Sequence, residues 1–245
     1  MKIKLIVPTE LSEIRLSQYQ KYYKIQEENK DESFLATKMI EIFCGIPHKD
    51  SFRMKLRDVT KVTNILADLF NKKPKLKQRF MMNEVEYGFI PNLDDMSLGE
   101  YVDLDTYISS WDDMHKAMAV LYRPVETSFN GKYTIEKYKG EGQELMKDMP
   151  LDVVFGSMLF FLSFRDRLIE SYDVLFSGQE ADAISAVGNF NGKYGWIGQI
   201  YFLCQYDITR VENITKLGLH ECLLMLTFMK EKNELEAREL KRKYK

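Results

Sequence analysis

The sequence predicts a mainly α-helical protein with one small antiparallel β-hairpin, an α+β arrangement. Apolar residues recur at helical spacing along most of the chain, while residues 79–91 alternate apolar and polar side chains as paired strands do. Hydrophobic residues make up 45% of the 245 positions and charged ones 29%, which is typical of a folded globular chain. We expect a helical region with a short N-terminal strand and the hairpin over residues 1–124, a loop over 125–149, and a second helical region over 150–245 that ends in a long charged helix.

The N-terminal part predicts a short strand followed by three helices. Residues 2–7 mix lysines with branched apolar side chains and stop at Pro8, as a strand does. The helices are expected over residues 10–28, over 32–44 with Gly45 as the C-terminal stop, and from an N-cap at Asp58 to Phe70. The lysine-rich run 71–77 that follows lacks interleaved aromatic residues, so we interpret it as a solvated linker.

Residues 79–91 are the segment that predicts the hairpin. In its second arm Val85, Tyr87 and Phe89 alternate with polar or small residues. We expect the turn at Asn83-Glu84. Pro91 then ends the pairing, because proline has no N–H to donate to a neighbouring strand.

The next segment, residues 94–113, holds seven acidic residues and no basic one. Ser97 with Glu100, and Ser110 with Asp113, have the spacing of capping boxes, so these acids are expected at helix starts, where the helix dipole favours negative charge. The second of these helices is expected over residues 111–122, stopped by Arg123-Pro124.

Two further helices precede the C-terminal one. They are expected over residues 151–176, ended by Ser177-Gly178, and over 196–204, with an irregular stretch before residue 195 and with Asp207 or Thr209 capping a turn afterwards. Within residues 132–135 of the long loop we also expect a short strand.

The last helix is predicted to run from about Leu217 almost to Lys245. Its inner face is expected to be the line of residues Leu217, His220, Leu224, Phe228 and Leu235. Ten of the final fifteen residues are charged, so this end of the helix has little apolar surface to bury. A polar helix of that length projects from its own domain or packs on another chain.

Motifs for chemistry are not found in the sequence. The histidines His48, His115 and His220 are too scattered for a metal site, and the loop 188–194 has the wrong glycine spacing for a phosphate loop. We therefore predict no catalytic, cofactor-binding or metal-binding residue. An enzyme whose groups meet only in the folded chain stays an alternative, with the acidic segment as the source of a carboxylate pair.

The net charge and the longest apolar run limit the classes of partner that we expect, and the cysteine positions indicate the state of the thiols. The net charge of −2 gives no general attraction to nucleic acid or anionic lipid, and the longest apolar run, residues 153–164, is too short to span a bilayer. Neither nucleic acid nor a membrane is an expected partner. Cys44, Cys204 and Cys222 lie in apolar surroundings and are expected as reduced, buried thiols.

Two stretches carry a resemblance to a known group of proteins: residues 87–105 (YGFIPNLDDMSLGEYVDLD) and residues 111–124 (WDDMHKAMAVLYRP). They resemble structural and assembly proteins of tailed bacteriophages, especially the crAss-like podoviruses of Bacteroidetes. The order of elements along most of the chain is similar as well. The resemblance implies a non-enzymatic virion protein, a ring or connector subunit of the neck or short tail. It also leaves a tail assembly chaperone, absent from the finished virion, as an alternative.

The resemblance further implies the partners and the location. Partners would be other phage structural proteins, such as portal, adaptor or tail components, and copies of the chain itself in a ring. The protein would lie in the virion, and in the host cytoplasm during assembly. Opposite charges would let the basic end of one copy meet the acidic segment of the next, head to tail. The residues expected to bind partners are Asp94, Asp95, Glu100, Asp103, Asp105, Arg238, Lys241, Arg242 and Lys243.

Overall fold

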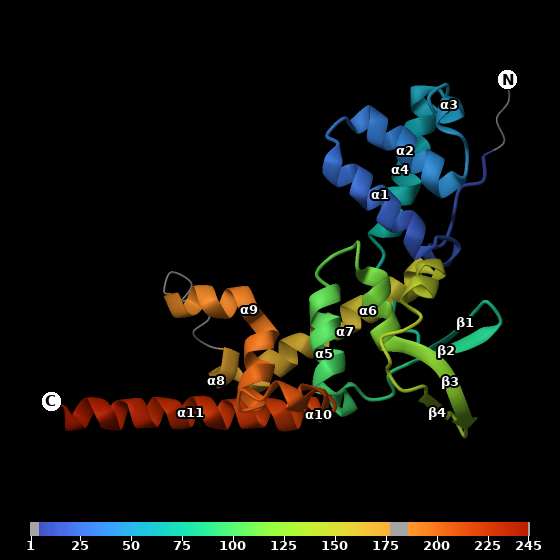
Figure 1. Cartoon of the computed structure of the whole chain (residues 1–245). Coiled ribbons are helices and arrows are strands. Elements are labelled where there is room, and N and C mark those ends of the chain that lie inside the picture. The colour runs from blue at the N-terminus through green and yellow to red at the C-terminus, as the bar shows by residue number, and fades with distance from the viewer. Residues whose placement is uncertain (1–4, 177–185, 245) are drawn as a thin grey trace. The chain divides into compact units, whose positions relative to one another are not determined.

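A computed structural model describes residues 5–176 and 186–244, with the side chains of 186–193 outside the description. The chain is 64% helical and has one four-stranded antiparallel sheet (Figure 1), so the predicted mainly α fold class is confirmed. The chain forms two compact units, and each is described by itself. Unit 1 contains residues 1–91 and 104–161, and unit 2 contains residues 92–103 and 162–245.

The elements follow one another along the chain as labelled in Figure 1. The first part contains η1 (Leu11–Glu13), α1 (Leu16–Glu28), α2 (Glu32–Cys44), α3 (His48–Ser51), α4 (Leu56–Phe70), β1 (Arg79–Met82), β2 (Val85–Phe89), η2 (Leu93–Asp95), α5 (Leu98–Tyr107), α6 (Met114–Leu121), β3 (Tyr122–Phe129) and β4 (Lys132–Ile135). The second part contains η3 (Gln143–Asp148), α7 (Leu151–Ser171), α8 (Asp173–Phe176), α9 (Ala186–Leu203), η4 (Ile208–Arg210), α10 (Val211–Thr215) and α11 (Leu219–Lys243).

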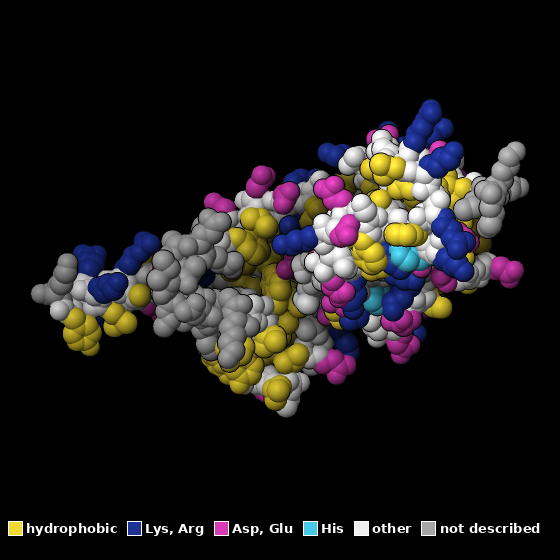
Figure 2. All heavy atoms as spheres, turned by 90° about the horizontal axis from the view of Figure 1, so that it is seen from above, with side chains coloured by type: hydrophobic (Ala, Val, Ile, Leu, Met, Phe, Trp, Pro, Cys, Tyr) yellow, Lys and Arg dark blue, Asp and Glu magenta, His cyan; other side chains and the backbone are white. Residues whose placement is uncertain are grey.

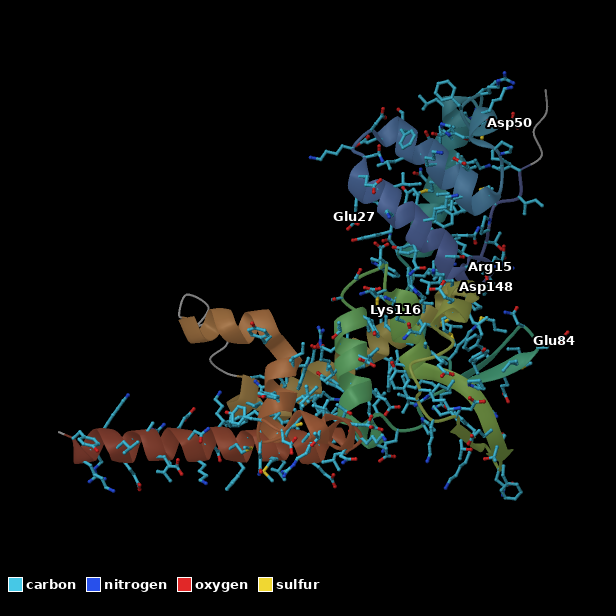
Figure 3. The ribbon with its side chains drawn as sticks, in the orientation of Figure 1. Arg15, Glu27, Asp50, Glu84, Lys116 and Asp148 are labelled. Atoms are coloured by element: carbon cyan, nitrogen blue, oxygen red, sulfur yellow. The ribbon has the colours of Figure 1, made fainter. Side chains whose placement is uncertain are left out.

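The predicted helix over residues 10–28 is divided in the structure. Ile14 and Arg15 are extended and form a β-bridge toward Pro150, in which the Leu151 N–H donates to the Ile14 carbonyl at 2.9 Å. The Ile14 side chain is completely buried, so this long-range pairing overrides the local helix preference. Arg15 and Asp148 also form an ion pair, 3.1 Å apart (Figure 3).

Among the remaining N-terminal predictions, the C-terminal stop of α2 is confirmed, while the first strand and the cap of α4 are wrong. Gly45 ends α2 in the left-handed region with φ 67°, as predicted. The strand predicted over residues 2–7 is wrong for residues 5–7, which lie in no strand, and its first residues lie outside the described part. The cap at Asp58 is also wrong, because α4 begins at Leu56 and its N-cap is Lys55, three residues before Asp58.

The four-stranded sheet has the order β1-β2-β3-β4, with every neighbouring pair antiparallel. The predicted hairpin turn is confirmed: Asn83 and Glu84 have φ of 51° and 65°, the two positive values that a type I′ turn requires. Glu84 lies at the tip of the β1–β2 hairpin (Figure 3).

Helix α6 ends at Leu121, one residue before the predicted end, but strand β3 corrects the prediction of a loop over residues 125–149. Tyr122 lies opposite Phe89 and Pro124 lies opposite Tyr87, so the chain leaves α6 directly into the sheet. Pro124 lacks an N–H but its carbonyl accepts from Glu136 N–H at 3.0 Å, which keeps it in the ladder. The strand expected over residues 132–135 is confirmed as β4.

Helix α6 begins at Met114, later than predicted, and Ser110 does not form a capping box with Asp113. Residues 111–113 form a turn before the helix, and the Gln20 side-chain amide donates to the backbone carbonyls of Trp111 at 2.6 Å and Asp112 at 3.3 Å there. The Trp111 ring packs 4.6 Å from that of Tyr19, and both rings are half-buried in unit 1.

Unit 2 combines η2, the first residues of α5 and the chain from residue 162 onward. The helix predicted over 151–176 is divided at Tyr172 into α7 and α8, and its predicted stop at residues 177–178 lies outside the described part. The irregular stretch predicted before residue 195 is wrong from Ala186 onward, because α9 begins there. At Gly195 the backbone leaves helical geometry, with φ 47° and ψ −125°. Asp207 accepts from Thr209 N–H, which confirms the predicted cap.

None of the described helices meets the length and apolar content needed to cross a membrane.

Candidate protein-binding surface

The acidic segment is attached to the start of α11 by backbone hydrogen bonds. Leu98 N–H donates to the carbonyl of Leu217, and Leu219 N–H donates to the carbonyl of Met96, both at 2.9 Å. These bonds form an antiparallel bridge between Ser97 and Gly218. Residues distant in the sequence therefore meet at one end of α11, within unit 2.

One side of α11 holds the helix in its unit. Leu219, Cys222, Leu223 and Leu226 are buried, and burial raises the pKa of the Cys222 thiol. Beyond them the attachment stops: every residue from 231 to 244 is exposed. The helix is thus held in unit 2 over residues 219–230, where Lys230 Nζ also donates to the carbonyl of Val174.

The opposite side of α11 carries an exposed apolar stripe that consists of Leu224, Phe228 and Leu235. Their exposed fractions are 65%, 59% and 58%. The successive spacings of 4 and 7 residues add up to 11, which is about three turns of 3.6 residues, so the three side chains form a line along the helix. Leu217, which was predicted on the same line, lies before the helix and is separated from it by the extended residue Gly218.

The prediction that this line faces inward is therefore wrong. Helical periodicity identified the line correctly, but α11 has a second apolar line, and that second one is buried. His220, which was placed on the same inner face, is half-exposed at the edge of the stripe. The sequence holds no signal that tells which of two apolar lines on one helix meets the body of its own unit.

His220 joins the acidic segment to α11. Its Nε2 lies 3.1 Å from Asp94 Oδ1, and its Nδ1 lies 2.9 Å from the Tyr172 hydroxyl. The hydrogen bonds are satisfied together when Tyr172 donates to Nδ1 and Nε2–H donates to Asp94. Burial raises the pKa of Tyr172, which keeps its proton available for that bond. The chain of three groups fixes Asp94 in place beside α11.

The other predicted acids have different environments. Asp95 is exposed next to Asp94 in η2. Glu100 forms a capping box: it accepts from the Ser97 N–H and hydroxyl at 2.9 Å, while Ser97 Oγ accepts from Glu100 N–H at 3.2 Å. Glu100 therefore has a structural role, the N-terminal cap of α5. Asp103 and Asp105 are half-buried on α5, which leaves Asp94 and Asp95 as the most accessible acids of the predicted set.

The predicted bases Arg238, Lys241, Arg242 and Lys243 lie at the far end of α11, where basic side chains are seen beside hydrophobic ones at the left of Figure 2. Arg238 pairs with Glu234 at 3.5 Å within the helix. A helix of 25 residues is about 37 Å long. Within unit 2 the structure therefore places Asp94 and Asp95 beside the start of α11 and the predicted bases at its far end, so these two groups do not meet in one copy.

The most buried histidine of the described residues is His115 in unit 1, which the sequence analysis set aside with the other scattered histidines. It is only 4% exposed, and its Nδ1 and Nε2 lie 3.2 Å from Gln20 Nε2 and 3.3 Å from Glu144 Oε1. Burial lowers the pKa of His115, which keeps it neutral, accepting at Nδ1 and donating at Nε2. It links α1, α6 and η3, a structural role.

Among the residues that the structure describes, no three His, Cys, Asp or Glu side chains gather as metal ligands. Burial raises the pKa of Cys44 to about 11, so its thiol is not activated as a nucleophile. Comparisons of the chain with protein-family models, with curated proteins and with solved structures found no significant match.

Proposed function

We propose that this protein works by binding other proteins, as a structural subunit of a tailed-bacteriophage particle that belongs to a ring or connector of the neck or short tail. The observation that carries the binding role is the exposed apolar stripe on the side of α11 away from its own unit. The phage setting is supported by the resemblance of residues 87–105 and 111–124.

The physical argument starts from the cost of exposing such a surface. Three large apolar side chains in one line do not lower the free energy of unit 2 when they face water, whereas each contributes roughly 1.5–3 kcal/mol when fully buried. Exposed apolar surface of this extent on one helix is typical of a binding face. The charged residues along its edges then select the partner and its orientation.

The partners proposed are portal, adaptor or tail components and further copies of the chain, in the virion and, during assembly, in the host cytoplasm. The test is mass spectrometry of purified particles of the phage that encodes the chain. A ring subunit is expected at a fixed copy number per particle. Absence from particles, together with co-purification with unassembled tail protein, would instead support the tail assembly chaperone.

A truncation after Lys230 tests the role of α11 directly. The described residues that it removes, 231–244, are all exposed, so the shortened chain is expected to keep its unfolding midpoint and to lose only the helical circular-dichroism signal of the removed turns. It should nevertheless be missing from particles. The control is Phe52→Ser, which removes an aromatic side chain that is 76% exposed from unit 1. If the truncated chain is incorporated as well as the control, the part of α11 after Lys230 is not part of the binding element.

A further inference from the structure

We infer that the apolar stripe of α11 binds the same stripe of a second copy, with the two helices antiparallel. The inference rests on the proposed protein-binding role, for which it names one partner and one geometry. Three features of α11 support it: the position of the stripe, the distribution of charge along the helix, and the register that both allow.

The position of the stripe leaves room for a second helix. Successive residues of a helix turn by about 100° around its axis. The buried residues Leu219, Cys222, Leu223 and Leu226 therefore lie opposite Leu224, Phe228 and Leu235. A helix that approaches along the stripe does not displace the contacts that hold α11 in its unit.

The distribution of charge selects the antiparallel orientation. Asp94, Asp95 and Glu221 lie at the start of α11, while Lys241, Arg242 and Lys243 lie at its end. In an antiparallel pair the basic end of each copy meets the acidic start of the other, twice by symmetry. A parallel pair would place acids beside acids and bases beside bases, which is unfavourable.

One register brings the apolar residues and the charges together. When Leu224 of one copy faces Leu235 of the other, the two-fold axis passes close to residues 229–230 and the two Phe228 side chains lie near it. The same register places Glu221 opposite Arg238 of the second copy. It also places Lys241 opposite Gly218, beside the segment that holds Asp94 and Asp95.

The exposed part of α11 also needs a partner for its own stability. Residues 231–244 contact nothing that buries them, and an isolated helix of that length is marginal in water. Internal pairs such as Lys232 with Glu236 and Glu234 with Arg238 are exposed and stabilise the helix only weakly. A second α11 alongside supplies the apolar contacts that unit 2 does not.

The first experiment measures self-association of the full chain by sedimentation equilibrium. We expect a discrete dimer, with Leu235→Glu raising its dissociation constant by about tenfold or more. Leu240→Glu is the matched control: Leu240 is equally exposed on α11 but lies about 140° around the axis from Leu235, so it should leave the dimer unchanged. A monomer at all concentrations, or equal effects of both variants, would overturn the inference.

The second experiment tests orientation and register by disulfide formation. Chains with Leu224→Cys are mixed with chains with Leu235→Cys under mild oxidation, and the expected cross-link forms in the mixture and not in either variant alone. Cross-linking of each variant with itself would indicate a parallel pair. Larger rings without this cross-link would indicate a head-to-tail contact. Either result contradicts the antiparallel pair while leaving the proposed virion role intact, which depends on the particle analysis.

A third experiment exchanges the charges of Glu221 and Arg238, which distinguishes the contribution of this ion pair from that of the apolar contacts. Glu221→Arg and Arg238→Glu should each weaken the dimer, because each places like charges opposite one another. The double variant should recover most of the affinity, since the exchanged pair forms twice in the dimer. Helix content by circular dichroism controls for the loss of the Arg238–Glu234 pair. A double variant weaker than both single ones would contradict the register.

Discussion

Asp94 and His220 are 126 positions apart in the chain, yet Asp94 Oδ1 lies 3.1 Å from His220 Nε2. This contact joins the acidic segment to the first turn of α11 inside unit 2. Residues 94–103 of the acidic segment therefore belong to the same unit as α11.

The Asp94–His220 contact predicts a small coupling energy. Because both side chains are substantially exposed, a double-mutant cycle of Asp94→Asn and His220→Gln should give about 0.2–1 kcal/mol in urea unfolding. Asp95→Asn, a change in the neighbouring exposed acid, serves as the control and should show no coupling to His220. Equal coupling for both acids would contradict a specific pair.

Gly156 predicts a strong effect from one added methyl group. A Cβ at this position would lie 2.5 Å from the backbone carbonyl oxygen of Lys75, which cannot move aside as a flexible side chain can. Gly156→Ala should therefore destabilise unit 1 by about 1–3 kcal/mol in chemical denaturation. Gly198→Ala is the control: its nearest neighbour atom is 4.0 Å away, so alanine in α9 should be neutral or slightly stabilising.

The β1–β2 turn predicts a stabilising substitution. Glu84 has φ 65°, which costs a residue with a side chain about 1 kcal/mol relative to glycine. Glu84→Gly should raise the free energy of unfolding by about 0.5–1 kcal/mol, because Asn-Gly suits a type I′ turn. The opposite change at the next turn, Gly131→Ala at φ 78°, should destabilise the β3–β4 connection. Thermal unfolding of the two variants is expected to shift in opposite directions.

His115 predicts a dependence of stability on pH. Its pKa in the folded chain lies below the ordinary value of 6.5, so the unfolded chain binds more protons between those two values. The contribution of neutral His115 is therefore fully present above about pH 6.5 and is lost as the pH falls toward the folded pKa. His115→Gln should remove this part of the pH dependence, measured as the variant-minus-wild-type difference in unfolding free energy between pH 5 and 8. A difference that does not change with pH would contradict burial of the neutral form.

Local rules predicted the elements whose determinants lie within a few residues. Gly45 ends α2 because only the left-handed backbone closes the helix there, and Asn83 with Glu84 makes the turn that the alternating arms require. Ser97 and Glu100 form their capping box within four residues. In each case the chain carries the structural signal in its immediate neighbourhood.

Long-range pairing decided the elements that were predicted wrongly. Ile14 is extended because its carbonyl accepts from Leu151 N–H beside the Arg15–Pro150 bridge, and Tyr122 to Phe129 form a strand because β2 is available beside them. For the candidate surface the sequence identified the apolar line of Leu224, Phe228 and Leu235 but not its side. Which of two lines is buried depends on the rest of unit 2, and a helical repeat does not contain that information.

The uncovered end of α11 makes protease cleavage a measure of whether the surface is occupied. Residues 231–244 include Lys232, Arg238 and Lys241, and all of them are exposed, so trypsin should shorten the free chain within this segment before it attacks the buried cores. When a partner covers α11, the same bonds should be cut more slowly. The rate at which the C-terminus is lost would then report binding in a mixture where no partner has been identified in advance.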